Sequence, residues 1–192
     1  PRSTLSSSSA ASDVYKRQQF DGVDDYVRIT HRDALNPADG SFTIAFWANL
    51  DLSRGTSGTT NWDLAVTKRD TGSVGFYVGA DRNQGSAEQA GYKFMLGSEK
   101  RVDTPFVLVP LGEWVYVTAV LDRENNVHKI SVDGGQTWAN NTPPANPVVP
   151  AQDLAIGWDI GPQDYWFRGA IDEVRIYNHA LSDAEIAWLA AN

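Results

Sequence analysis

Residues 167–189 read Phe-Arg-Gly-Ala-Ile-Asp-Glu-Val-Arg-Ile-Tyr-Asn-His-Ala-Leu-Ser-Asp-Ala-Glu-Ile-Ala-Trp-Leu, and they decide the fold class. Residues 171–177 alternate between apolar and polar side chains, which is typical of a half-buried strand. Val174 and Ile176 fall on its apolar face. Ser182 and Glu185 have the spacing of a capping box, which predicts a short helix. The stretch therefore predicts a closing strand followed by a C-terminal helix.

Asp172 shares the apolar face in this alternation. A carboxylate on the inward side of a strand is costly unless ionic or hydrogen-bonding partners meet it. We therefore expect Asp172 either to ligate a cation or to accept hydrogen bonds from backbone N–H groups.

A second informative stretch, Phe20-Asp-Gly-Val-Asp-Asp-Tyr-Val27, lies near the start of the chain. Together with Gly169–Ser182 it resembles the signature pair of laminin-G-like jelly-roll domains of the concanavalin A-like lectin/glucanase superfamily. The two stretches bracket about 160 residues. The resemblance implies an all-β, two-sheet antiparallel jelly-roll sandwich, and His179 is a mild departure from the family's usual Arg.

Short β-prone segments fill the interval between these two stretches. They recur at a spacing of roughly 8–12 residues without interior helices, which favours a sandwich. The expected strands are 26–29, 41–50, 63–69, 75–80, 92–97, 106–109, 114–122, 127–133 and 154–158. One core between the sheets should hold Phe42, Ile44, Phe46, Val115, Val117, Val174 and Ile176.

Length and composition bound the function. The 192 residues, 42% of them hydrophobic, suit one large β domain, which we place at residues 19–192. The net charge of −8 argues against a nucleic-acid partner. Zero cysteines exclude disulfides and thiolate metal sites. The longest apolar runs are too short for insertion into a membrane.

Residues 1–18 are Ser-rich and lack both a Met start and an apolar signal-peptide core. They resemble translated sequencing adapter, which implies a metagenomic, uncultured microbial source. We therefore predict a non-native or disordered leader, with a native Ser-rich linker as the alternative.

Acidic residues cluster in the first loop, as Asp21, Asp24 and Asp25. In the resembled family this loop and the Asp at the position of Asp172 hold one calcium ion. Calcium takes six to eight oxygen ligands, so Asp21, Gly22 through its carbonyl, Asp24 and Asp172 form the predicted structural metal site. In the alternative, the loop aspartates form an Asx-type turn and Asp172 accepts backbone N–H groups.

Residues 131–138, Ser-Val-Asp-Gly-Gly-Gln-Thr-Trp, fit the "Asp box" that recurs in sialidase propellers. A propeller needs several copies, whereas this chain has one. The motif therefore predicts a hairpin turned at Asp133-Gly134, with Trp138 packed beside it.

Several aromatic residues stand in or beside predicted loops, next to polar residues. Sugar C–H faces stack on aromatic rings while neighbouring polar groups bind hydroxyls. The predicted ligand-binding residues are Trp62, Asn61, Arg82, Trp158, Tyr165 and Trp166. For each aromatic taken singly, burial in the core is the competing interpretation.

No catalytic arrangement is evident. Glucanases of this fold carry Glu-x-Asp-x-x-Glu or Glu-x-Asp-x-Glu on one strand, and this chain has neither. The three histidines are far apart, with His31 and His128 expected at the surface or in loops.

The sequence thus favours a non-catalytic module that binds a carbohydrate or a cell-surface glycoconjugate, within a larger secreted microbial protein. An extracellular or bacterial cell-surface location follows from that interpretation. The alternative is a calcium-stiffened adhesion or spacer module that contacts proteins or other domains of the parent protein, and a glycoside hydrolase is a weaker third interpretation.

Overall fold

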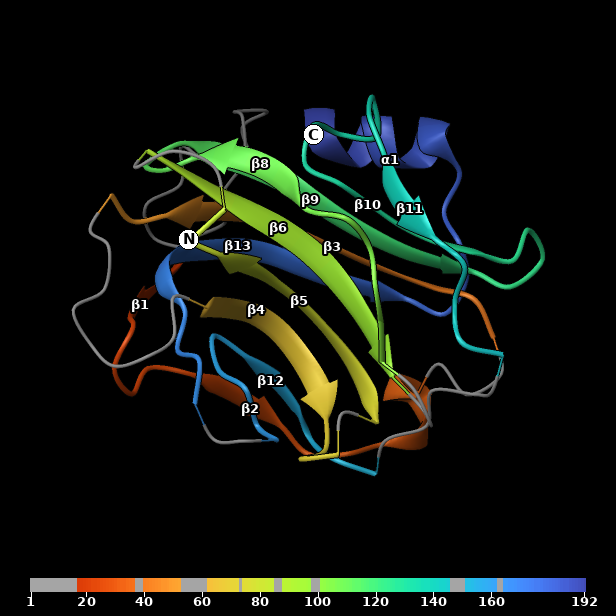
Figure 1. Ribbon diagram of the computed structural model, residues 1–192, viewed down its shortest axis with the longest axis horizontal. Coiled ribbons are helices and arrows are strands. Elements are labelled where there is room, and N and C mark those ends of the chain that lie inside the picture. Colours follow the sequence, from red (N-terminus) through yellow and green to blue (C-terminus); the bar gives the residue numbers. More distant parts are fainter. Residues whose placement is uncertain are drawn as a thin grey trace, which may run out of the picture.

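The structure is a computed structural model, and the chain forms an antiparallel β-sandwich of two stacked sheets with one C-terminal helix (Figure 1). It describes residues 17–36, 40–52, 62–72, 74–84, 88–97, 101–145, 151–161 and 164–192. No helix within these ranges is long and apolar enough to cross a membrane. The all-β class and the two-sheet architecture predicted from the sequence are confirmed.

The first sheet has six strands in the order β1-β13-β3-β9-β10-β11. Their bounds are β1 Gln18–Asp21, β13 Arg168–Tyr177, β3 Phe42–Leu50, β9 Trp114–Asp122, β10 Val127–Ser131 and β11 Ala139–Asn141. The predicted closing strand, β13, lies between the first strand and β3. The two signature stretches of the sequence are therefore neighbours in this sheet.

The second sheet has seven strands in the order β2-β12-β4-β5-β6-β7, with β8 pairing to β6 beside β7. Their bounds are β2 Val27–Ile29, β12 Leu154–Ile156, β4 Trp62–Arg69, β5 Gly75–Asp81, β6 Gln89–Gly97, β7 Arg101–Asp103 and β8 Val107–Pro110. A 3-10 turn, η2 (Asp33–Leu35), follows β2.

The core lies between the sheets and is built by alternation along the strands. Phe42, Ile44 and Phe46 of β3 are at most 2% exposed and pack against Val117 of β9. The partly buried members of the same cluster include Val115, Val174 and Ile176. All seven residues predicted for the core therefore lie in it.

The helix α1 (Asp183–Ala191) covers part of the outer face of the six-stranded sheet (Figure 1). It starts at the predicted capping box, in which the Ser182 hydroxyl accepts from Glu185 N and the Glu185 carboxylate accepts from Ser182 N. Ile186 and Leu189 point down onto the sheet.

The Asp box is the predicted hairpin turn, and it packs beside α1. Asp133 Oδ1 accepts from the backbone N–H groups of Gln136 and Thr137, both at 3.0 Å, and Asp133 Oδ2 accepts from Thr137 Oγ1 at 2.6 Å. Gly134 and Gly135 have positive φ, as the turn requires. Trp138 lies in the cluster under α1.

A β-bulge in β13 changes the predicted position of Asp172. Residue 172 lies opposite Trp47 and residue 175 lies opposite Ala45, so the strand holds one extra residue, and Glu173 has φ of 51°. Because a bulge inverts the alternation, Asp172 shares the outer face with Trp47, while Val174 and Ile176 remain on the core side. The prediction that Asp172 shares their apolar face was wrong.

The strand β1 begins at Gln18, which pairs with Ile171. The sheet therefore starts one residue before the predicted domain boundary. Residues 1–16 of the predicted leader lie outside the described residues.

Candidate functional site

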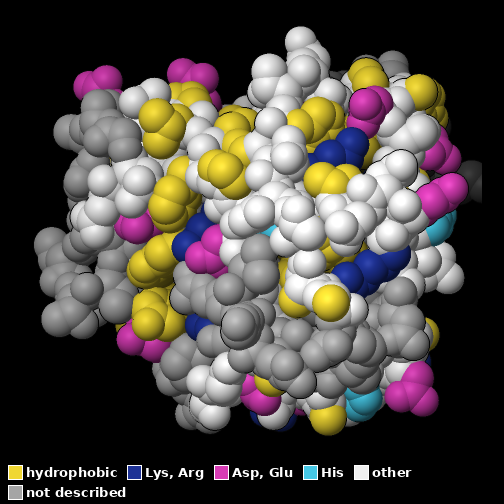
Figure 2. Space-filling view, turned by 45° about the vertical axis from the view of Figure 1, so that its right-hand side comes forward, with side chains coloured by type: hydrophobic (Ala, Val, Ile, Leu, Met, Phe, Trp, Pro, Cys, Tyr) yellow, Lys and Arg dark blue, Asp and Glu magenta, His cyan; other side chains and the backbone are white. Residues whose placement is uncertain are grey.

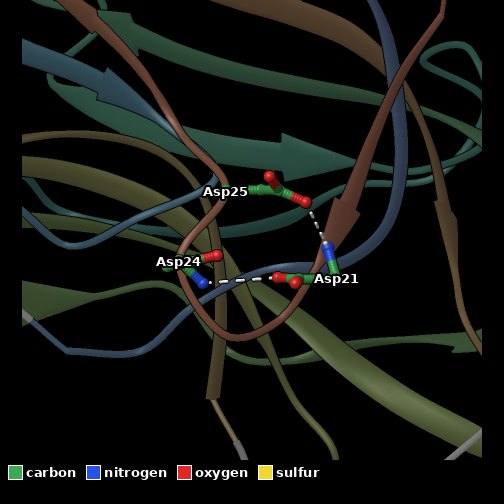
Figure 3. Close-up of side chains that lie close together, drawn as sticks. All are labelled: Asp21, Asp24 and Asp25. Carbon is green, nitrogen blue, oxygen red and sulfur yellow. Dashed lines mark hydrogen bonds between the residues drawn. The ribbon is translucent and has the colours of Figure 1, made fainter.

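The loop of residues 21–25 connects β1 of the six-stranded sheet to β2 of the seven-stranded sheet. Asp21, Asp24 and Asp25 point into this loop, and one carboxylate oxygen from each lies within 4.8 Å of the others (Figure 3). All three side chains are exposed. We call this group the aspartate loop.

Hydrogen bonds within the loop hold its shape. Asp21 Oδ1 accepts from Val23 N at 2.7 Å. It also accepts from Asp24 N at 3.3 Å, and Asp25 Oδ2 accepts from Asp21 N at 3.0 Å (Figure 3). The bond from the Val23 N–H is the main reason that the pKa of Asp21 lies below its ordinary value. The Asx-type turn is therefore present, and its carboxylate is ionised at neutral pH.

Arg168 of β13 lies against the back of the aspartate loop. Its Nε donates to the Asp21 carbonyl at 3.2 Å. Gly22 has φ of +77°, and a Cβ atom added there would meet the Arg168 side chain at 2.7 Å. Glycine is needed at this position because the turn and the arginine leave no room for a side chain.

Asp172 is not part of this cluster, which corrects the predicted metal site. The register of β1 on β13 places Arg168 opposite Asp21, with Asp172 four residues further along the strand and on the outer face. Asp172 Oδ1 instead accepts from Glu173 N at 2.8 Å. Asp25 joins Asp21 and Asp24 in its place, and the exposed triple-aspartate cluster could bind a metal ion.

An aromatic stack continues from the aspartate loop. The rings of Trp158 and Trp166 are stacked, with centroids 5.3 Å apart and planes 16° from parallel. The ring of Tyr26 packs against both, with its centroid 4.8 Å from that of Trp158 and 5.9 Å from that of Trp166. Tyr26 is 47% exposed and directly follows Asp25. The structure thus brings together two of the predicted ligand-binding residues, Trp158 and Trp166, with a tyrosine that the sequence analysis did not select.

The other two predicted aromatics meet at a separate place. Trp62 and Tyr165 line a small hollow of about 80 Å³ on the outer face of the seven-stranded sheet, with Leu64, Arg69 and Tyr77. The rings of Trp62 and Tyr77 meet edge to face at 6.1 Å. Asn61, predicted beside Trp62, lies outside the described residues.

Arg82 is wrong as a ligand-binding residue, because it is only 2% exposed. Its guanidinium group forms a buried ion pair with Asp63, and it also donates to the carbonyl oxygens of Asp51 at 2.7 Å and Arg168 at 3.0 Å. These bonds connect Arg82, directly after β5, to Asp63 of β4, to Asp51 directly after β3, and to Arg168 of β13. Arg82 therefore stabilises the sandwich.

Charged side chains elsewhere lie beside aromatic ones. Lys93 Nζ is 4.5 Å from the centroid of Trp62, and Arg69 Cζ is 5.0 Å from that of Tyr77. Figure 2 shows basic and hydrophobic side chains interleaved on one face, with acidic side chains beside them. Lys93 is also paired with Asp103 and Arg69 with Asp159, so these cations are neutralised locally.

Comparison with known families agrees with this architecture. Residues 21–187 match the family described as the concanavalin A-like lectin/glucanases superfamily. The chain belongs to this superfamily. None of the curated proteins compared with it matches it significantly in sequence.

Solved structures show the same fold at low sequence identity. The chain is similar to a heptameric SAP-like pentraxin from Limulus polyphemus, with a TM-score of 0.64 and 15% identity. The match covers 93% of this chain and 83% of the pentraxin. It is also similar to the CBM40 of a Ruminococcus gnavus IT-sialidase, solved bound to α2,3-sialyllactose, with a TM-score of 0.63, 17% identity, and coverage of 91% and 97%.

A third similar structure is the binding domain of Paraclostridial Mosquitocidal Protein 1, with a TM-score of 0.65 and 12% identity. The match covers 91% of this chain but only 42% of that one. Like the pentraxin and the CBM40, it shares the concanavalin A-like fold. At these identities the likeness concerns the fold alone.

Proposed function

We propose that this domain is a non-catalytic carbohydrate- or glycoconjugate-binding accessory module of a larger secreted microbial protein. The observation that carries the proposal is the half-exposed stack of Tyr26, Trp158 and Trp166 directly beside the aspartate loop. Aromatic faces and exposed carboxylates are the two components that a saccharide site needs.

The two components have separate roles. A sugar ring presents C–H groups that pack on an aromatic face, and Tyr26 is the most accessible ring of the stack. Hydroxyl groups at the ring edge would then face the aspartate loop. Carboxylates accept hydrogen bonds from hydroxyl groups directly, and a bound cation would instead coordinate the hydroxyl oxygens.

We propose calcium as the cation of the aspartate loop. Its ligands would be carboxylate oxygens of Asp21, Asp24 and Asp25, with the Gly22 carbonyl as a further oxygen donor. Hard oxygen ligands favour calcium or magnesium, and calcium tolerates the irregular geometry of a five-residue loop better than magnesium does. In this proposal the ion shapes the loop and adds an electrophilic contact for hydroxyl groups.

The tryptophans support glycan binding over a purely structural role. Each of the seven is at least partly exposed, and these include Trp158 and Trp166 of the stack. The sialyllactose carried by the similar CBM40 makes that trisaccharide a sensible first probe. For a domain with this function we propose a location outside the cell or on a bacterial cell surface.

A glycan array that includes α2,3-sialyllactose tests the proposal, with calcium and with chelator. Trp166→Ala should reduce binding of any positive glycan at least tenfold, whereas Trp188→Ala should leave it unchanged. Trp188 is the matched control because it is an exposed tryptophan on α1, away from the stack. Binding that survives Trp166→Ala would contradict the assignment of this site.

The alternative is an adhesion or spacer module whose calcium stiffens the loop. Val23, at the tip of the aspartate loop, is 60% exposed, and Tyr26 beside it is 47% exposed. Two exposed hydrophobic residues could also contact a protein partner. A blank glycan array combined with calcium-dependent melting would favour this function.

A glycoside hydrolase would require an acid and a second carboxylate about 5 Å apart or more across a cleft. The proposal of a non-catalytic module predicts that a glycan that binds is recovered intact after long incubation, as measured by mass spectrometry. Release of a shorter product would overturn it.

A further inference from the structure

The outer face of the six-stranded sheet is only partly covered by α1. Its floor is set by strand register, which places Gln19, Ala170, Asn49 and Trp114 side by side across β1, β13, β3 and β9. Residues that pair directly across strands share one face of a sheet. Two amides, one methyl group and one indole therefore form a continuous row on this face.

A second row runs beside the first. It consists of Asp172, Trp47 and Tyr116, which are opposite one another on β13, β3 and β9. The rings of Trp47 and Tyr116 meet edge to face, with centroids 5.1 Å apart. Together the rows place three large aromatic side chains in one area of the sheet.

Two hollows lie on this floor. One, of about 280 Å³, is lined by residues that include Arg17, Gln19, Asn49, Asp51 and Trp114. The other, of about 530 Å³, lies between Trp47, Trp114 and Tyr116 on the floor, the Asp-box turn, and the end of α1. Because Trp114 lines both, the hollows adjoin, and we call them together the sheet trough.

Several of the residues that form the walls of the larger hollow have small side chains, which leave the hollow wide. On the helix side they are Ala187, Ala190 and Ala191, and on the turn side they include Gly134 and the amide of Gln136. Longer side chains at these helix positions would fill the space above Trp114. The larger hollow is therefore open because α1 carries alanine at the positions that line it.

We propose that the sheet trough is a second, calcium-independent binding site for an uncharged oligosaccharide chain. It extends the proposed saccharide-binding function to a different part of the molecule. The larger hollow lies beside α1, which Figure 1 shows on the opposite side of the view from β2. The smaller hollow reaches Gln19 of β1, two residues before Asp21, so the trough ends next to the aspartate loop. The aromatic stack is separate from it, because Tyr26 and Trp158 adjoin β2 and β12 of the other sheet.

The chemistry of the lining selects this class of ligand. The indoles of Trp47 and Trp114 offer apolar surfaces for sugar rings, and the amides of Gln19, Asn49 and Gln136 can both donate to and accept from hydroxyl groups. A peptide strand would need an unpaired strand edge for main-chain hydrogen bonds, whereas the floor of the trough is the face of paired strands.

The charge of the lining and the length of the trough also favour an uncharged oligosaccharide chain. Arg17 and Asp51 border one end, and Asp133 borders the other, so the described lining has no excess positive charge for an acidic polymer. Burial acts to raise the pKa of Asp133, but the hydrogen bonds from Thr137, Ser131 and Gln136 together lower it below its ordinary value, so the carboxylate is anionic. Four neighbouring strands span about 14 Å, which accommodates several sugar units rather than one.

The test is titration of the full chain, in chelator, with neutral hexasaccharides of cellulose, xylan, mannan and starch type, followed by NMR of the indole N–H groups. We expect at least one hexasaccharide to shift the Trp114 resonance, assigned by its loss in Trp114→Phe. Affinity for that sugar should rise from disaccharide to hexasaccharide. Absence of binding by all four hexasaccharides would overturn the proposal.

Matched variants separate the two sites. Trp114→Ala and Ala187→Trp, the latter an exposed helix position that would fill the trough, should each weaken hexasaccharide binding at least tenfold. Trp166→Ala and Trp188→Ala should not change it. Loss of binding in Trp166→Ala alone would overturn the trough while supporting the stack beside the aspartate loop. If Trp114→Ala fails to fold, Ala187→Trp, which leaves the sheet intact, decides the question.

Discussion

His128 is buried in the core between the sheets, with its ring edge-to-face against Phe94 at 5.7 Å. Neither ring nitrogen has a hydrogen-bond partner among the described residues. Burial is the main reason that the pKa of His128 is lowered to about 4. The expectation that it lies at the surface was wrong, although its spacing from Ile130, which also points inward, was a signal in the sequence.

Because His128 is buried and neutral, we expect the free energy of unfolding to fall in mild acid. The folded state holds His128 neutral until about pH 4, whereas the unfolded chain takes up the proton near pH 6.5. The unfolded state therefore binds more protons between these values, and the free energy of unfolding should fall by up to about 3 kcal/mol as the pH drops from 6.5 to 4.

Urea unfolding at several pH values measures this effect. His128→Leu should flatten the dependence between pH 6.5 and 4, while His179→Gln, a change at an exposed histidine, should not. An equally steep loss of stability in His128→Leu would assign the acid sensitivity to carboxylates instead.

Glu173 is a second residue whose role depends on local backbone geometry. It occupies the bulge of β13 with φ of 51°, a conformation that β-branched residues adopt with difficulty. Its carboxylate also pairs with Arg175 at 2.8 Å, a half-exposed contact that contributes less than about 1 kcal/mol.

The bulge therefore predicts opposite outcomes for two substitutions. Glu173→Val should lower the free energy of unfolding by about 1–3 kcal/mol, because it adds backbone strain to the loss of the ion pair. Glu173→Gly should remain within about 1 kcal/mol of the wild type, since relief of strain offsets that loss. Thermal melts of both variants provide the measurement, and equal destabilisation would mean that the bulge is not strained.

At the scale of elements, the long strands and the helix could be predicted because their signals are local. Alternation predicted β3 and β13, a run of β-prone residues predicted β9, and the spacing of Ser182 and Glu185 predicted α1. The strands β1, β7 and β11 have only three or four residues each. They are too short for periodicity to show, and β1 is formed by pairing with a strand at the far end of the chain.

For the candidate site, the sequence predicted which types of residue take part but not how they are grouped in space. The aspartates of the loop and the pair Trp158 and Trp166 were identifiable as residue types suited to cations and sugars. Their grouping was not, since the bulge that removes Asp172 and the buried ion pair that occupies Arg82 depend on contacts between distant segments.

The Asp box is an element whose stability depends on one carboxylate. Asp133→Ala would leave two backbone N–H groups and two hydroxyl groups, those of Ser131 and Thr137, without their acceptor. We expect a loss of about 2–4 kcal/mol, because several hydrogen bonds to one charged group are removed together. Chemical denaturation should show this loss, while Glu113→Ala, a change at an exposed residue, should alter stability by less than about 0.5 kcal/mol.

At the scale of the whole molecule, the aspartate loop is a junction between the sheets. It carries the chain from β1 at the edge of one sheet to β2 at the edge of the other. Three exposed carboxylates repel one another there, and only Arg168, through the Asp21 carbonyl, is a described cationic contact. A cation in the loop would remove this repulsion and fix the crossing between the sheets.

Calcium should therefore stabilise the fold, and the effect should depend on Asp24 but not on Asp172. By mass action, free calcium at about 100 times its dissociation constant adds about 2.7 kcal/mol to the free energy of unfolding. Thermal melts with calcium and with chelator measure the increment. Asp24→Ala should abolish it because it removes a carboxylate ligand from the loop, whereas Asp172→Asn should preserve it because that carboxylate lies four residues along β13 from Arg168 and on the outer face. Loss of the increment in Asp172→Asn would restore the shared site that the sequence predicted, and a wild-type melting temperature indifferent to calcium would leave the loop as an Asx-type turn held by its own backbone.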